Sequence, residues 1–230
     1  MIDKDILDRI RIIRLHPAYE SLSDQILSDL AEKTKRMYFA KGDFIFHQEE
    51  PSDSMYIIET GRVIVAKNAP SGKTFTFVVG LPGATLNAVT CFKQRPRYFS
   101  ATAVEDTTVL AASSHDFSAW VLSHPQVTIG TIDILGSLLN EAYNKIIDLI
   151  DESVEQRIIN TLMMLYSRIG PRLPFTNMEL ADMTGTSRET AARAISRLQA
   201  AGLISKFRSR IEIIDPDRLK ELSGNHIFLI

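Results

Sequence analysis

Hydrophobic positions change their period along the chain, and the secondary structure that they predict changes with it. Residues 3–14 and 24–35 carry apolar residues at helical intervals, which predicts two short helices separated by His16-Pro17. Between residues 36 and 113 the chain has short β-branched and aromatic runs, the clearest at 44–47, 54–59, 62–67 and 73–79, with Gly42, Gly61, Gly72 and Gly83 between or near them. Short strands at such intervals predict a small β-barrel or sandwich.

A helical period returns in residues 114–122, which predict a short helix that stops before Pro125, and it continues from 127 to about 152. Six apolar residues of this second stretch alternate at spacings of three and four and form a heptad seam: Ile132, Leu135, Leu139, Ala142, Ile146 and Leu149. A second stripe of Ile134, Leu138 and Ile150 would face the chain's own β-structure. We expect the heptad seam to pair two copies of the chain. A single broad face buried within one chain is the alternative.

Two helix starts lie close together near the C-terminus. Thr176 precedes Glu179 by three residues, Thr186 precedes Glu189 by the same interval, and both pairs fit a capping box. Gly185 lies in the turn between them, where a positive φ is least costly for glycine. The pattern predicts helices at about 177–183 and 187–201 that form a helix–turn–helix.

A wing follows the second helix. Gly202 would end that helix, and two strands at 203–207 and 211–214 would flank a basic turn containing Arg208. Asp215-Pro216 then predicts the start of a short last helix. Two capped helices followed by a wing define a winged helix–turn–helix, an architecture that binds double-stranded DNA.

The start of the second helix carries Arg188, Glu189 and Arg193 within little more than one turn. Arginine suits the O6 and N7 atoms of guanine, and glutamate can accept a hydrogen bond from the N4 amino group of cytosine. A solvated helix face is the plain alternative for such a pattern. The surrounding wing and caps favour base recognition.

Residues 178–204 resemble the DNA-binding domain of the cyclic-AMP receptor protein and fumarate-nitrate regulator (CRP/FNR) superfamily. Ser187-Arg188-Glu189-Thr190, followed by Arg193, is similar to the cyclic-AMP receptor branch. The resemblance implies that Arg188, Glu189 and Arg193 read TGTGA-like half-sites. It also implies phosphate contacts at Thr176, Ser187 and Thr190, to which the basic wing turn would add Arg208.

Upstream, Lys41-Gly42-Asp43, His47-Gln48 and Gly61-Arg62-Val63 resemble the β-roll of the cyclic-nucleotide-binding domain, with a departure at Glu49, where the family often has glycine. The implied fold is α+β: a β-roll effector domain over residues 1–126, a dimerisation helix and hinge over 127–153, and a winged helix–turn–helix over 154–230. The implied partners are double-stranded DNA, a second copy of the chain, a small-molecule effector and, for an activator, RNA polymerase.

The effector segment lacks the residues that hold a cyclic nucleotide in the cyclic-AMP receptor. The receptor's Gly-Glu-Leu segment corresponds to Asn87-Ala88-Val89 of this chain, and the arginine of the receptor's Arg-Ser-Ala segment corresponds to Phe99. A phosphate without its arginine would be poorly paired in a partly dry site, so we expect an effector other than cyclic AMP. A one-residue slip of register would bring Arg97 inward. A pocket rearranged in this way would suit a cyclic nucleotide or another anionic molecule.

The positions that correspond to the receptor's effector pocket are mostly apolar or aromatic, which suits haem or another flat, largely apolar ligand. These positions are Leu86, Asn87, Ala88, Val89, Phe99, Ser100, Leu138, Ala142 and Tyr143. Some relatives bind haem and sense carbon monoxide or nitric oxide, and the chain resembles regulators of the hybrid cluster protein, which respond to nitrosative stress. Candidate axial ligands are His16, His47, His115, His124, His226, Cys91 and several methionines, but their spacing defines no metal site. A pocket filled by core side chains is the alternative.

Composition narrows the function further. Residues 155–222 hold 11 Lys and Arg against 8 Asp and Glu, whereas residues 1–154 hold 15 against 20, which places a basic module on an acidic body. The single cysteine, Cys91, excludes an intrachain disulfide and an iron–sulfur cluster held by four cysteines of one chain. We expect a cytoplasmic protein without a signal peptide or a membrane partner.

Two other classes of function fit the sequence less well. An enzyme on a β-roll scaffold would need paired carboxylates, a nucleophile elbow or a phosphate-cradling glycine loop, and none occurs in a supportive context. A nucleotide-sensing subunit of a kinase or channel would not carry the C-terminal wing. We therefore expect a regulator and not an enzyme.

Overall fold

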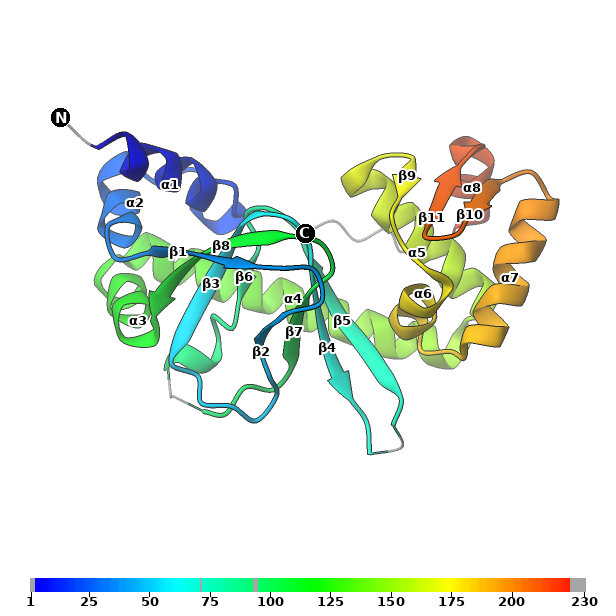
Figure 1. The fold of residues 1–230 in the computed structure, drawn as a ribbon, viewed down its shortest axis with the longest axis horizontal. Coiled ribbons are helices and arrows are strands. Elements are labelled where there is room, and N and C mark those ends of the chain that lie inside the picture. Colours follow the sequence, from blue (N-terminus) through cyan, green and yellow to red (C-terminus); the bar gives the residue numbers. More distant parts are fainter. Residues whose placement is uncertain (1–2, 71, 93–94, 224–230) are drawn as a thin grey trace. The chain divides into compact units, whose positions relative to one another are not determined.

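The computed structural model describes residues 3–70, 72–92 and 95–223 (Figure 1). They belong to two compact units, the first formed by residues 1–69 and 76–136 and the second by 70–75 and 137–230. Helix α4 (Pro125–Asp151) contributes its first half to one unit and its second half to the other. The three-part division expected from the sequence stays a prediction.

The first unit begins with α1 (Lys4–Arg14), the 3-10 turn η1 (Pro17–Tyr19) and α2 (Asp24–Ala31). Two four-stranded sheets follow, with strand orders β1-β8-β3-β6 and β2-β7-β4-β5. Their strands are β1 (Lys35–Phe39), β2 (Phe44–Phe46), β3 (Ser54–Thr60), β4 (Val63–Asn68), β5 (Thr74–Gly80), β6 (Thr85–Leu86), β7 (Ser100–Ala103) and β8 (Thr107–Ser113). The 3-10 turn η2 (Thr90–Phe92) precedes β7, and α3 (Ser114–Ser123) follows β8. The short strands expected from the sequence are confirmed.

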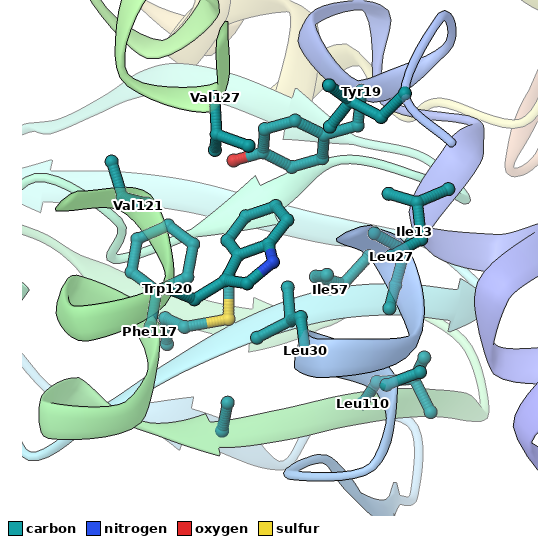
Figure 2. Packing of buried hydrophobic residues seen from close by; sticks show 14 of the residues in the cluster. Ile13, Tyr19, Leu27, Leu30, Ile57, Leu110, Phe117, Trp120, Val121 and Val127 are labelled. Atoms are coloured by element: carbon teal, nitrogen blue, oxygen red, sulfur yellow. The ribbon is translucent and has the colours of Figure 1, made fainter. Parts of the chain in front are cut away.

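Strand β3 shows how one strand supplies two cores. Met55 and Ile57 belong to the cluster beside the helices, whereas Tyr56 and Ile58 belong to the cluster inside the roll. Successive side chains of a strand point to opposite faces, and residues 55–58 are all apolar, so both faces of β3 can be buried. In the helix-side cluster the indole of Trp120 packs edge-on against Tyr19, with ring centroids 5.2 Å apart (Figure 2).

After the second half of α4, the second unit contains a winged helix–turn–helix. The elements of the winged helix–turn–helix are α5 (Val154–Ile169), β9 (Arg172–Leu173), α6 (Asn177–Thr184), α7 (Arg188–Ala200), β10 (Ile204–Phe207), β11 (Arg210–Ile213) and α8 (Pro216–Leu222). The strands form one sheet in the order β10-β11-β9 (Figure 1). Buried Leu162, Leu180 and Ile195 come from α5, α6 and α7, so the three helices share one apolar core.

The long helix begins two residues earlier than the sequence predicts, at Pro125 instead of residue 127. Proline is accepted in the first turn of a helix because the backbone N–H that it lacks would have no partner there. In the part of the chain that the structure describes, no helix combines the length and the apolar character needed to cross a membrane.

Candidate DNA-binding surface and effector segment

The first helix of the helix–turn–helix starts as predicted. The hydroxyl of Thr176 accepts the backbone N–H of Glu179 at 3.3 Å, and the Glu179 carboxylate accepts the backbone N–H of Thr176 at 2.7 Å. This is a complete capping box. The helix ends at Gly185, whose φ of 63° lies in the left-handed region that glycine adopts at low cost.

The second capping box, Thr186 with Glu189, is wrong by one residue. The backbone N–H of Thr186 donates to the carbonyl of Ala181 at 3.0 Å, so Thr186 still belongs to the end of α6. Ser187 is the N-cap of α7, and its hydroxyl accepts the backbone N–H of Thr190 at 3.2 Å. Two Ser or Thr residues in succession made the cap ambiguous in the sequence.

The structure brings the three predicted base-reading residues together. Arg188, Glu189 and Arg193 are exposed on the first two turns of α7. The opposite face of the helix is buried through Ala191, Ala194, Ile195 and Leu198. The guanidinium of Arg193 donates to the Thr190 hydroxyl at 3.2 Å, which holds its long side chain against the helix surface.

The Glu189 carboxylate is held in its charged form. Its own backbone N–H and the Ser187 hydroxyl donate to it and lower the pKa of Glu189, and the charges of Arg188 and Arg193 add to this effect. An ionised carboxylate is a hydrogen-bond acceptor only, as recognition of a cytosine amino group requires.

Basic side chains also line the wing. Lys206, Arg208 and Arg210 are exposed on or between β10 and β11. The guanidinium of Arg210 lies over the Phe207 ring, 4.5 Å from its centroid. The predicted phosphate-contacting residue Arg208 therefore lies at the tip of a basic hairpin.

The apolar residues expected to form an effector pocket do not share one location. Leu86 and Phe99 pack against the core inside the roll, whereas Ala88 packs against the separate cluster beside the helices. Val89 is 51% exposed. The chain turns sharply between Leu86 and Ala88 because Asn87 has a φ of 65°.

Asn87 and Ser100 have structural partners. The Asn87 side-chain amide donates to the Ser52 hydroxyl at 2.8 Å and to the Ser54 carbonyl at 2.7 Å, which stabilises the turn. The Ser100 hydroxyl accepts the backbone N–H of Gln48 at 2.9 Å. Both side chains thus stabilise the local backbone.

Arg97 is a basic residue whose side chain points into the roll, in agreement with the slipped register that the sequence allows. Its side chain is 5% exposed, and its guanidinium lies 4.6 Å from the centroid of the Phe46 ring. It donates to Asp53 at 2.9 Å, and Glu50 lies 3.5 Å away. Its charge is therefore already balanced by two carboxylates.

The last three residues predicted for the pocket lie on the half of α4 that belongs to the second unit: Leu138, Ala142 and Tyr143. Leu138 and Ala142 are half-buried and Tyr143 is 56% exposed. All 27 residues of α4 are described, and Val127 alone among them is buried. The heptad seam is thus largely uncovered in a single chain: Ile132, Leu139, Ile146 and Leu149 are exposed.

The candidate axial ligands are scattered through the fold. His16 stacks on Tyr19, His47 stacks on Phe44, and His124 caps the end of α3 by hydrogen bonding to the Trp120 carbonyl. Burial raises the pKa of the Cys91 thiol, and Cys91 accepts a hydrogen bond from Ser114 at 3.2 Å. His226 lies outside the described residues. The described residues contain no group of three or more His, Cys, Asp or Glu arranged to hold a metal ion.

A β-roll, a long helix with an uncovered apolar face and a winged helix–turn–helix whose second helix exposes Arg188 and Arg193 are the features of a DNA-binding transcription regulator. Residues 36–124 match the family described as the cyclic nucleotide-binding domain, and residues 156–222 match the Crp-like helix-turn-helix domain. The chain belongs to the CRP/FNR superfamily of transcription regulators.

Relatives support this assignment over nearly the whole chain. The CRP-like cAMP-activated global transcriptional regulator of Mycobacterium tuberculosis is 24% identical, covering 87% of this chain and 93% of the relative. The cyclic AMP receptor protein of Thermus thermophilus is 26% identical, covering 90% and 96%. The solved structure of FixK2 from Bradyrhizobium japonicum has the same fold, with a TM-score of 0.74 and 20% identity, covering 83% of this chain and 98% of FixK2.

Phe77 was not assigned to the effector region from the sequence, and Arg97 was assigned to it only in the alternative with a slipped register. Phe77 on β5 stacks on Phe99, with ring centroids 4.8 Å apart and planes 13° apart. Phe75 and Phe77 are two residues apart, so strand geometry places both aromatic rings on one face of β5, but their spacing does not indicate the contact with Phe99. The position of Arg97 depended on a loop whose length the motif alone did not define.

Proposed function

We propose that the protein binds a TGTGA–spacer–TCACA palindrome as a homodimer and is controlled by a small-molecule effector. The observation that carries this proposal is the exposed cluster of Arg188, Glu189 and Arg193 on a helix whose start is fixed by Ser187. These side chains have the donors and acceptor that guanine and cytosine edges match. The half-sites would lie about one helical turn apart.

Homodimerisation is supported by the heptad seam on α4. Ile132 is 63% exposed and Ile146 is 55% exposed, although both are large and apolar. An uncovered apolar stripe with heptad spacing is best covered by the same stripe of a second copy, because a two-fold axis makes such a surface self-complementary. Two-fold symmetry also matches a palindromic DNA site.

As effector we propose haem or another flat, largely apolar molecule, with nitric oxide or carbon monoxide sensing in the case of haem. The stacked pair of Phe77 and Phe99 supports this proposal, because Phe77 is 36% exposed and offers an aromatic surface. Asn87 and Ala88 offer no carboxylate to a ribose, and Phe99 offers no charge to a phosphate. Cytoplasmic location and, for an activator, contact with RNA polymerase belong to the same proposal.

Arg97 favours a second candidate, an anionic effector. Its guanidinium is buried and its Nε has no hydrogen-bond partner, which leaves one donor for an incoming anion. Asp53, its closest carboxylate partner, has a side chain that is 76% exposed and could move aside into water. The balanced charge of this cluster reduces its attraction for a phosphate, so we rank this candidate second.

The DNA proposal is tested by competition gel shift with the palindrome and with a scrambled duplex of equal length. Equal affinity for both would contradict it. The effector proposals are separated by absorbance titration with haem and by calorimetric titration with cyclic AMP. A shift of the Soret band supports haem, whereas low-micromolar binding of cyclic AMP supports an anionic effector at Arg97.

A further inference from the structure

One guanidinium joins the end of the long helix to the turn of the helix–turn–helix. Arg157, on α5, donates from Nε to the backbone carbonyl of Thr184 at 3.0 Å and from Nη1 to the backbone carbonyl of Glu152 at 2.7 Å. Glu152 directly follows α4, and Thr184 is the last residue of α6. All of these residues belong to the second unit, so the contact lies within one compact body.

Both acceptors are carbonyls at helix ends, where no intrahelical N–H reaches them and a cation is favoured by the helix dipole. Thr184 is buried, and its carbonyl therefore needs a donor from the protein. Arginine presents several donors in a rigid plane, whereas lysine is a single flexible point charge. Arg157 can thus fix the spacing between two helix ends in a way that lysine reproduces only in part.

Two further contacts hold the end of α4 in the same place. The Asn160 side-chain amide donates to both oxygens of the Glu152 carboxylate, at 3.1 and 2.9 Å. On the other side, a Cβ added to Gly185 would lie 3.0 Å from a terminal methyl of Leu149. Leu149 on α4 therefore lies directly beside the turn that begins at Thr184.

The turn leads straight to the reading face. Ser187, the cap of α7, follows Thr184 by three residues, and Arg188 comes next. We propose that Arg157 is a positioning residue that couples the end of α4 to the recognition helix, so that a displacement of α4 changes the orientation of Arg188 and Glu189. The consequence for DNA binding rests on the proposed function, whereas the consequence for the order of the turn does not.

The test compares Arg157→Gln with Arg168→Gln, which changes an exposed arginine near the other end of the same helix. Native-state hydrogen exchange is measured for the full chain. The amides of Gly185 and Thr186, which donate to Ala181, should exchange about 10-fold faster in Arg157→Gln than in wild type. The amides of β10 and β11 should change less, and Arg168→Gln should leave both groups near wild-type values.

In the DNA arm, Arg157→Gln should lower affinity for the palindrome about 10-fold, and Arg157→Lys should restore part of the loss. If wild type fails to bind the palindrome, the proposed function fails while the exchange arm is still informative.

Unchanged exchange at Gly185 and Thr186 in folded Arg157→Gln overturns the coupling. Equal acceleration of hydrogen exchange in β10 and β11 also overturns the coupling, because it would show that Arg157 stabilises the whole unit. If Arg157→Gln does not fold, hydrogen exchange is measured in Arg157→Lys instead. Wild-type protection of the Gly185 and Thr186 amides in that variant would contradict the coupling.

Discussion

In the structure the Ser187 hydroxyl accepts the backbone N–H of Thr190, over 3.2 Å, and so fixes the first turn of the recognition helix. Replacing Ser187 by Ala should lower the free energy of unfolding by about 1 kcal/mol, because an N–H at the helix start loses its partner. Thr186→Ala is the matched control and should change the free energy by less than about 0.5 kcal/mol. Urea unfolding of both variants measures this difference. A larger loss in Thr186→Ala would place the cap one residue earlier.

Arg188 should determine one base of each half-site. Arg188→Ala should weaken binding to the palindrome by about 1–3 kcal/mol and relax selectivity at a single guanine. Arg172→Ala removes another exposed charge, from β9, and should weaken binding less, with no change in base preference. Gel-shift competition against duplexes substituted at each position measures both effects. Full discrimination by Arg188→Ala would rule out its role in base reading.

The heptad seam should hold two copies of the chain together. Leu139→Glu places a charge in the middle of the seam and should convert the dimer to monomer, because a carboxylate cannot be buried there unpaired. Leu122→Glu on α3 is the control, since Leu122 is similarly large and 69% exposed but lies outside the seam. Sedimentation velocity distinguishes the two masses. A wild-type monomer at micromolar concentration would refute the dimer.

Glu49 carries backbone strain that glycine would remove. Its φ of 68° lies in the left-handed region, which costs an L-residue roughly 1–2 kcal/mol. Glu49→Gly should therefore raise the free energy of unfolding by up to about 1 kcal/mol, despite the greater entropy of the unfolded chain. Glu105→Gly, at an exposed position outside the left-handed region, should be neutral or destabilising. Thermal unfolding of both variants checks the sign, and a lower melting temperature for Glu49→Gly would contradict this account.

His16 should make the first unit less stable in acid. Burial lowers the pKa of His16 from 6.5 to about 4. Because its folded-state pKa is depressed, the neutral ring is favoured by folding, so stability is complete above pH 6.5 and is lost as the pH falls from 6.5 towards 4. The loss should reach about 3 kcal/mol.

His16→Asn is the matched variant for this effect. It keeps a side-chain acceptor for the backbone N–H of Ala18, which His16 now caps at 3.3 Å, but it does not titrate. Urea unfolding at pH 7 and pH 4.5 should show a smaller loss in His16→Asn than in wild type. Parallel pH profiles for the two proteins would show that another group is responsible.

The sequence by itself determined the local structure of this protein. The pair Thr176 and Glu179 defined the start of α6, and Gly185 defined its end, because caps and left-handed turns depend on a few neighbouring residues. The alternation of Tyr56 and Ile57 determined that β3 has two covered faces, because strand side chains alternate with a period of two. The exposed face of α7 that carries Arg188 follows from the helical period of Ala191, Ile195 and Leu198, which are all buried.

Tertiary structure decided which distant groups meet. The chain reverses at Asn87, so Leu86 and Ala88 enter different cores although they are two residues apart. Arg97 points into the roll because its backbone pairs with Glu49 and Glu50, a register that depends on the loop before it. Arg157 meets the carbonyls of Glu152 and Thr184 only once three helices have packed. Contacts of this kind join residues through packing and loop geometry, and no local pattern of residue types encodes them.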